Sequence, residues 1–263
     1  MSLRPITYIF PLLLAFGSTI FAQTPAALEK ELLGYLETMS KFGTYGGEYD
    51  DEKLNAASEA LKQSLLKYAR RGDVLKHSFP NLSKAMFIAT SKDGKFRVYS
   101  WDLESGGTMH DYDRIIQFIG SSGKVQSWTD GEEELDGGGA FYTDVFQVST
   151  RPGPIYLLSS TSRASSSLIG ASLRAMRIVG DRLETQSKVI KTASGMTSDI
   201  GFAYDFFSVV DRPERPIRLF TFNEARKEFR FPVVIEDDET PQGRVTQKFI
   251  TYRFNGMHFV KVN

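Results

Sequence analysis

From about Leu82 onward, short runs of aromatic and β-branched residues alternate with turn-forming residues, and no other feature constrains the fold more. Runs of this kind, bounded by Gly, Asn, Asp and Pro, are typical of β-strands. Two such runs flank the tight-turn signal Lys92-Asp93-Gly94. The sequence therefore predicts a mainly β domain of antiparallel hairpins over residues 83–263. The six expected strand pairs are Met86–Thr90 with Phe96–Trp101, Ile115–Ile119 with Val125–Trp128, Asp144–Val148 with Ile155–Leu158, Leu173–Val179 with Leu183–Gln186, Ile217–Phe222 with Phe229–Ile235, and Phe249–Phe254 with His258–Val262.

The hairpin turns recur at fairly regular intervals. They lie near residues 94, 123, 153, 180, 225 and 256, which are 29, 30, 27, 45 and 31 residues apart. The longest interval holds Ile200–Val210, an aromatic run that predicts a further strand. Repeated antiparallel units favour a propeller-like meander. The intervals are shorter than a four-stranded blade requires, so a β-sandwich is the alternative.

Residues 23–82 show helical rather than strand periodicity. Thr24 and Pro25 suit the N-cap and first position of a helix, and Asp50 or Asp51 suits the start of a second helix. Gly72 suits its end. We therefore expect an N-terminal helical hairpin packed on the β domain. Its two apolar stripes are Leu28, Leu32, Tyr35, Leu36 and Met39, and then Leu54, Ala57, Leu61, Leu65 and Tyr68.

The first 22 residues have the order of a secretory signal peptide. Arg4 gives a positive start, Ile6–Phe21 is apolar and uncharged, and Ala22 supplies a small residue before Gln23. The apolar stretch is short for a membrane span, which needs about 20 residues. An uncleaved N-terminal anchor is the alternative. The expectation is export, to the periplasm or out of the cell.

Charge and cysteine content exclude several classes of partner. The chain has 32 basic and 32 acidic residues, so it has no long-range attraction for nucleic acid. It has no cysteine, which excludes disulfides and a lipidated cysteine and favours a bacterial exported protein. No later segment is apolar enough for an integral membrane span, so none is expected after signal cleavage.

One loop gathers more polar chemistry than any other segment. Tyr99–Asp113 joins two expected strands and contains two adjacent glycines. Oxygen-rich loops can hold a hard cation, and an exposed Trp can stack on a sugar ring. A plain connecting loop with solvated carboxylates is the alternative. The candidate ligand-binding residues are Trp101, Asp102, Glu104, Thr108, His110, Asp111 and Asp113, with Tyr112 and Trp128 beside them.

A second acidic loop, Asp130–Gly139, is the candidate metal site. Asp130, Glu132 and Asp136 are the expected ligands, and calcium is the cation that this composition favours. Leu135 stands where an EF-hand loop requires glycine, so the loop is not an EF-hand. A solvated hairpin tip is the alternative.

The stretch Asp93–Asp102, followed by Gly106-Gly107-Thr108-Met109, resembles a motif of uncharacterised secreted proteins of Bacteroidetes-type bacteria. The closing pattern Phe249–Phe254, Asn255-Gly256 and Phe259 is similar to the end of such chains. The resemblance is sharpest at Asp93–Met109. It implies export and a β-rich fold, and it implies no activity.

Three functions remain open on this sequence. It contains no Gly-x-Ser-x-Gly elbow, no His-Glu-x-x-His and no phosphate loop. The leading hypothesis is therefore a non-catalytic exported protein that binds an envelope protein, a glycan or another ligand. The alternatives are a hydrolase of envelope polymers that uses paired carboxylates and a purely structural exported protein. The carboxylates available to a hydrolase are Asp102, Glu104, Asp111, Asp113 and Glu132.

Overall fold

The computed structural model describes residues 23–129 and 139–262. Three helices come first, α1 (Pro25–Phe42), α2 (Asp51–Tyr68) and the short α3 (Gly72–Lys76). A single 3-10 turn, η1 (Leu82–Lys84), leads into the strands. The fold of the described residues is mainly β, as the sequence predicts.

The strands form three sheets. The first contains β1 (Phe87–Thr90), β2 (Phe96–Asp102), β3 (Tyr112–Ile119) and β4 (Val125–Trp128), paired in that order. The second has the order β11-β7-β6-β5, with bounds β5 (Phe141–Val148), β6 (Ile155–Arg163), β7 (Leu168–Val179) and β11 (Asp199–Asp205), and β8 (Arg182–Glu184) pairs with β7. The third has the order β10-β9-β15-β14-β13-β12, with bounds β9 (Ile190–Thr192), β10 (Gly195–Thr197), β12 (Thr221–Asn223), β13 (Glu228–Ile235), β14 (Arg244–Phe254) and β15 (Phe259–Val262).

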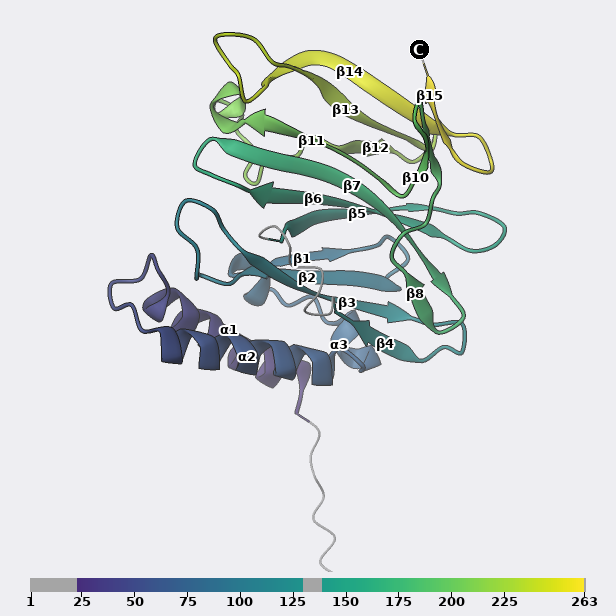
Figure 1. Cartoon of the computed structure of the whole chain (residues 1–263). Coiled ribbons are helices and arrows are strands. Elements are labelled where there is room, and N and C mark those ends of the chain that lie inside the picture. The colour runs from purple at the N-terminus through teal and green to yellow at the C-terminus, as the bar shows by residue number, and fades with distance from the viewer. Residues whose placement is uncertain (1–22, 130–138, 263) are drawn as a thin grey trace, which may run out of the picture.

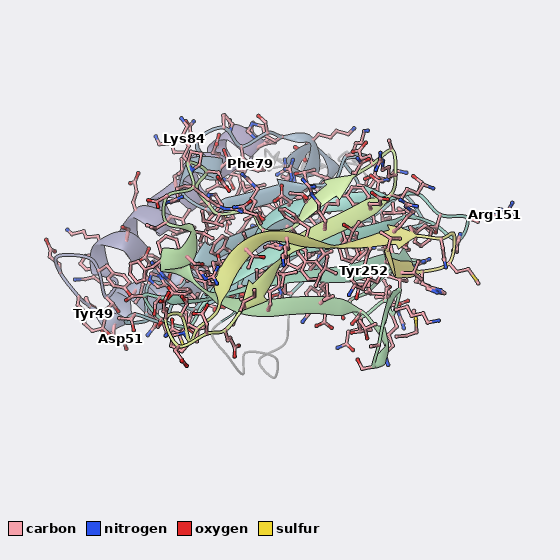
Figure 2. The ribbon with its side chains drawn as sticks, turned by 90° about the horizontal axis from the view of Figure 1, so that it is seen from above. Tyr49, Asp51, Phe79, Lys84, Arg151 and Tyr252 are labelled. Carbon is pink, nitrogen blue, oxygen red and sulfur yellow. The ribbon has the colours of Figure 1, made fainter. Side chains whose placement is uncertain are left out.

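The helices and the three sheets are stacked in layers (Figure 1). From bottom to top the order is α1 to α3, the β1–β4 sheet, the β5–β6–β7–β11 sheet and the β12–β15 sheet. Seen from above, β14 curves across the molecule, with Tyr49 and Arg151 at opposite ends (Figure 2). The described strands do not close into a propeller or a barrel.

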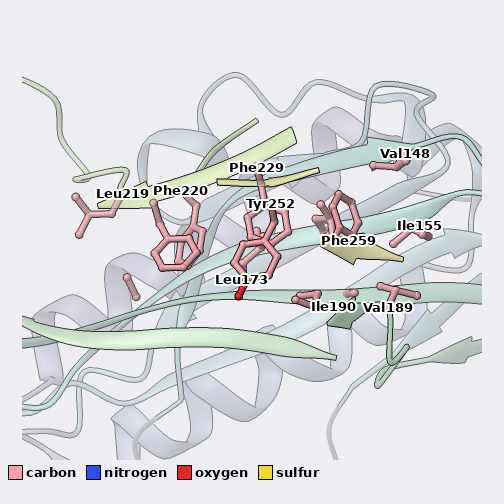
Figure 3. Close-up of a cluster of buried hydrophobic side chains, with 14 of the residues drawn as sticks. Val148, Ile155, Leu173, Val189, Ile190, Leu219, Phe220, Phe229, Tyr252 and Phe259 are labelled. Carbon is pink, nitrogen blue, oxygen red and sulfur yellow. The ribbon is translucent and has the colours of Figure 1, made fainter. Parts of the chain in front are cut away.

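Each contact between layers has its own hydrophobic core. The helices and the first sheet share one that includes Leu32, Leu61 and Trp101. The first and second sheets share another around Phe96 and Tyr156. The second and third sheets share the aromatic cluster of Figure 3, where the rings of Phe229 and Tyr252 stack 5.1 Å apart, centroid to centroid.

Burial on two faces explains the sequence of the middle layers. In β6, Ile155 and Leu157 face the third sheet, whereas Tyr156 and Leu158 face the first. A strand covered on both sides needs a continuous apolar run rather than alternation. The same rule explains β2, which buries Val98 on one face and Tyr99 on the other.

The expected hairpins are confirmed by the strand pairing. All six pairs occur as antiparallel ladders, given by β1–β2, β3–β4, β5–β6, β7–β8, β12–β13 and β14–β15. The predicted strand Ile217–Phe222 is corrected to the shorter β12, because residues 217–220 do not form a strand. The run Ile200–Val210 forms β11 and the 3-10 turn η3 (Phe206–Val209). The short strands β9 and β10 were not predicted, and β15 pairs with β9 in parallel.

The helical hairpin is also confirmed, with one correction at its end. Thr24 caps α1 by accepting the Ala27 N–H, and Asp50 caps α2 by accepting the Lys53 N–H. Gly72 does not end the second helix, which stops at Tyr68, and instead begins α3. The helices share a core with the first sheet, and the expected domain boundary at 82/83 stays a prediction.

Candidate functional site

The β2–β3 loop, residues 103–111, brings Asp102 and His110 together. The Asp102 Oδ2 atom is hydrogen-bonded to His110 Nδ1, and the two side chains are 22% and 15% exposed. Asp102 Oδ1 accepts the Glu104 N–H at 2.8 Å, so both carboxylate oxygens have partners. Two residues that the sequence proposed as ligand contacts therefore form a partly buried pair.

The other imidazole nitrogen of His110 faces two groups from distant segments. Nη1 of Arg163, at the end of β6, lies 3.1 Å from Nε2, and the Tyr45 hydroxyl lies 3.3 Å from it. A guanidinium has only donors, so Nε2 accepts and Nδ1 carries the proton that Asp102 accepts. The rings of Tyr45 and Tyr112 lie nearly parallel to the imidazole, at centroid distances of 5.1 and 6.2 Å. We call Tyr45, Asp102, His110, Tyr112 and Arg163 the His110 cluster.

Backbone hydrogen bonds hold this loop against the end of β6 and against the segment that follows α1. The His110 N–H donates to the Arg163 carbonyl, and the Thr44 N–H donates to the Glu104 carbonyl. Glu104 has a positive φ of 57°, which is rare for a residue with a side chain. Its Cβ lies so close to Gly43 that a Cβ on Gly43 would be 2.5 Å away. Gly43 thus ends α1 and also makes room for Glu104.

Glu104 and Asp102 line a cavity of about 310 Å³ whose remaining lining comes from α1 and Ala85. Burial raises the pKa of Glu104 above its ordinary value, and the negative charge of Asp102 raises it further. His110 opposes this shift. Glu104 is therefore protonated more readily than an ordinary glutamate, beside an Asp102 that is hydrogen-bonded to imidazole.

A second cavity, of about 290 Å³, borders the His110 cluster through Tyr112 and Arg163. Most of its wall is apolar and aromatic, with Phe87 and Phe141 stacked 4.1 Å apart between centroids. Arg163 and Arg215 supply its two cationic groups. We call this space the aromatic cavity. Burial and the nearby Asp102 raise the pKa of the Tyr112 hydroxyl, so Tyr112 itself adds no negative charge to the wall.

The two tryptophans are not exposed stacking platforms. Trp101 is 1% exposed and belongs to the core between the helices and the first sheet. Trp128 packs against the core between the first and second sheets. The expectation that Trp101 is exposed for a ligand is wrong, because α1 and α2 cover the face of β2 on which it lies. Tyr112 is 7% exposed and contributes to the aromatic cavity instead.

The remaining predicted loop residues lie outside the His110 cluster. Asp113 forms an ion pair with Lys62 of α2 at 2.9 Å, with its side chain only 12% exposed. Asp111 accepts the Leu103 N–H through its backbone carbonyl, and Thr108 is exposed. The cluster therefore includes Asp102 and His110, with Glu104 beside it, and excludes these three.

The structure forms no metal site from the candidate residues that it describes. Within residues 23–129 and 139–262, no group of three or more His, Asp and Glu side chains is placed to hold a metal ion. Asp102 and Asp113 instead pair with His110 and Lys62. The expected calcium ligands Asp130, Glu132 and Asp136 lie outside the described residues.

Three residues of the candidate site are not predicted from the sequence, namely Tyr45, Arg163 and Arg215. Arg163 is 53 residues from His110, and the two meet through an isolated antiparallel bridge. Tyr45 lies in the α1–α2 connection, 65 residues from His110. No sequence pattern around these residues indicates their role, because that role depends on which loops meet at one end of the stacked sheets.

Comparison with family models, with curated proteins and with solved structures finds no match to this chain. Within the described part of the chain, none of the helices combines the length and apolar character that crossing a membrane requires. The chemistry that this site can perform therefore follows from the geometry of the His110 cluster and its two cavities.

Proposed function

We propose that this protein is exported to the bacterial envelope and binds a small ligand in the aromatic cavity without transforming it. One observation carries the proposal: an apolar, aromatic-walled cavity is bordered by a polar cluster whose members already hold one another in place. Ligand sites typically combine an apolar lining with a few convergent polar groups. The cavity, at about 290 Å³, suits a small ligand.

Export is the second part of the proposal. The leader pattern of residues 1–22 supports it, as does the resemblance of Asp93–Met109 to secreted proteins of Bacteroidetes-type bacteria. Expression of the full chain in a bacterial host, with mass determination of the recovered protein, tests it. We expect a mature chain that begins at Gln23. A cytoplasmic chain that retains its leader would contradict export.

The stacking of three sheets, with a shared core at each contact, supports the sandwich-like alternative for the scaffold over the propeller-like one. Loops at the end of such a rigid scaffold are frequent binding positions. The loop at 103–111 and the end of β6 meet in this way at the His110 cluster.

Binding of prodan, a neutral naphthalene dye that fluoresces strongly in apolar surroundings, tests the cavity. We expect one saturable site on the purified protein. Thr161 lines the aromatic cavity, so Thr161→Phe is expected to abolish the signal by filling space. Thr221→Phe makes the same change on an exposed strand away from this cavity and is expected to retain binding.

Circular dichroism must show that both variants stay folded. Absence of dye binding to the wild-type protein would sink the ligand-binding proposal. Binding that survives Thr161→Phe in a folded protein would move the site elsewhere. If the wild-type protein binds no dye, a purely structural role explains the protein better than ligand binding.

A hydrolase is the second candidate, favoured by the Glu104 carboxyl whose pKa is raised beside Asp102 in a shared cavity. Hydrolases of glycans use such pairs, one carboxyl protonated and one ionised. Turnover of glycan and ester panels that is lost in Glu104→Gln would support this candidate. A panel without turnover would leave ligand binding as the function.

A further inference from the structure

The aromatic cavity carries an unusual charge for an apolar space. Its wall has two guanidinium groups, and neither Arg163 nor Arg215 forms an ion pair with a carboxylate in the part of the chain that the structure describes. Arg163 is half-buried, whereas Arg215 is exposed. A partly buried charge such as that of Arg163 is normally paired, because a desolvated charge without a counter-charge is unfavourable. The cavity thus presents positive charge against apolar surface.

Arg163 is the better placed of the two. It is half-buried, and its one side-chain hydrogen bond in the described structure runs from Nη1 to His110 Nε2. A guanidinium has five N–H donors in a planar fork that matches a carboxylate or sulfate. The bond to His110 fixes the direction of the group and leaves most of its donors available.

Arg215 lies at another part of the same wall and is held by backbone groups. Its Nη atoms donate to the carbonyl oxygens of Val210, Arg212 and Glu214, at 2.6 to 2.7 Å. Its guanidinium lies 5.8 Å from the ring centroid of Phe206, another residue of the cavity wall. These contacts keep the positive charge of Arg215 at the wall of the aromatic cavity.

From this geometry we infer that the aromatic cavity selects a small amphipathic anion, with its carboxylate or sulfate head on Arg163 and its apolar body against the aromatic wall. This inference rests on the proposed ligand-binding function and adds the chemical class of the ligand. Charge-assisted, bidentate hydrogen bonds to the head would favour the anion over a neutral analogue of equal size. A cation of the same length would meet two unpaired positive charges.

Isothermal titration calorimetry with four compounds of one chain length separates head from body. The probes are octanoate, octyl sulfate, 1-octanol and octyltrimethylammonium, each titrated into the purified wild-type protein. We expect octanoate or octyl sulfate to bind about tenfold or more tightly than octanol, and the ammonium compound not to bind. The relative affinity of octanoate and octyl sulfate shows whether the cavity recognises a carboxylate specifically or any anionic head group.

Arginine variants then locate the head. Arg163→Gln is expected to reduce the affinity for octanoate to about that for octanol, while Arg163→Lys retains part of the preference because the charge remains. Arg215→Gln is expected to weaken octanoate binding less than Arg163→Gln. Arg182→Gln, which removes an exposed arginine of β8, is the matched control and should leave all affinities unchanged.

Two negative results have different meanings. Octanol binding as tightly as octanoate would overturn the anion inference while the cavity remains a ligand site. Failure of every alkyl compound to bind, together with the absence of prodan binding, would overturn the proposed function itself. If Arg163→Gln still bound octanoate more tightly than octanol, the inference would also be contradicted, because a group other than Arg163 would then bind the anionic head.

Discussion

At the scale of single residues, Arg97 shows how a buried cation is accommodated without an acidic partner. It is 6% exposed, and within residues 23–129 and 139–262 no carboxylate pairs with it. Nη1 donates to the carbonyl oxygens of His77 and Val74 at 2.8 and 3.2 Å, and Nε donates to Thr90 Oγ1 at 2.8 Å. The guanidinium therefore ties the end of α3 to the first sheet.

Replacing Arg97 with an apolar residue tests this role. Arg97→Met is expected to lower the free energy of unfolding by about 1–3 kcal/mol, because the partly buried His77 carbonyl loses its donor. Urea denaturation followed by circular dichroism measures it. Arg226→Met, at an exposed position, is the control and should stay within about 0.5 kcal/mol of wild type. Equal stability of the two variants would contradict the structural role of Arg97.

At the scale of elements, Glu31 joins the two long helices. Its carboxylate accepts hydrogen bonds from Gln23 Nε2 and from Ser64 Oγ of α2, each at 2.7 Å. Burial acts to raise the pKa of Glu31, but these hydrogen bonds, with smaller contributions from Tyr35 and Lys67, bring it below the ordinary 4.5. The contact between α1 and α2 therefore favours the ionised carboxylate.

This shift makes the helical hairpin sensitive to acid. Because the pKa of Glu31 is lower in the folded than in the unfolded chain, its contribution to stability is present above pH 4.5 and is lost as the pH falls through the folded-state value. When the pH is lowered from neutral to below the folded-state pKa of Glu31, the free energy of unfolding is expected to fall less in Glu31→Gln than in wild type. Denaturant titrations across pH measure the difference, with the exposed Glu59→Gln as control. Identical pH dependence in Glu31→Gln and wild type would contradict the linkage.

The elements themselves were largely predictable because their signals are local. Thr24 caps α1 through a residue three positions away, and the Asp93-Gly94 turn joins strands that pair directly with each other. The strands β9 and β10 lie outside the predicted runs, because three residues are too few for a periodic pattern. β8 and β12 are equally short, but each overlaps a longer predicted run. Gly72 begins α3 instead of ending α2, because glycine tolerates both the end of one helix and the start of another.

At the scale of the whole molecule, the layers explain both the core and the candidate site. Trp101, which sequence reasoning placed on a binding surface, is buried because the helices form an additional layer over the first sheet. The same stacking brings the β2–β3 loop and the end of β6 together, so that His110 meets Arg163. Of the candidate site, the sequence alone identified Asp102, Glu104 and His110 in one loop, but it did not reveal their partners.

The sequence by itself determined the mainly β character, the six hairpins and the two capped helices, because each depends on contacts between residues near in the chain. Only the tertiary structure decided that the hairpins distribute over three stacked sheets and that a cavity with two arginines forms between them. Alternating hydrophobicity shows that a strand face is buried, but it does not show against which layer. The partners of a buried face, and the loops that meet at its end, depend on long-range packing.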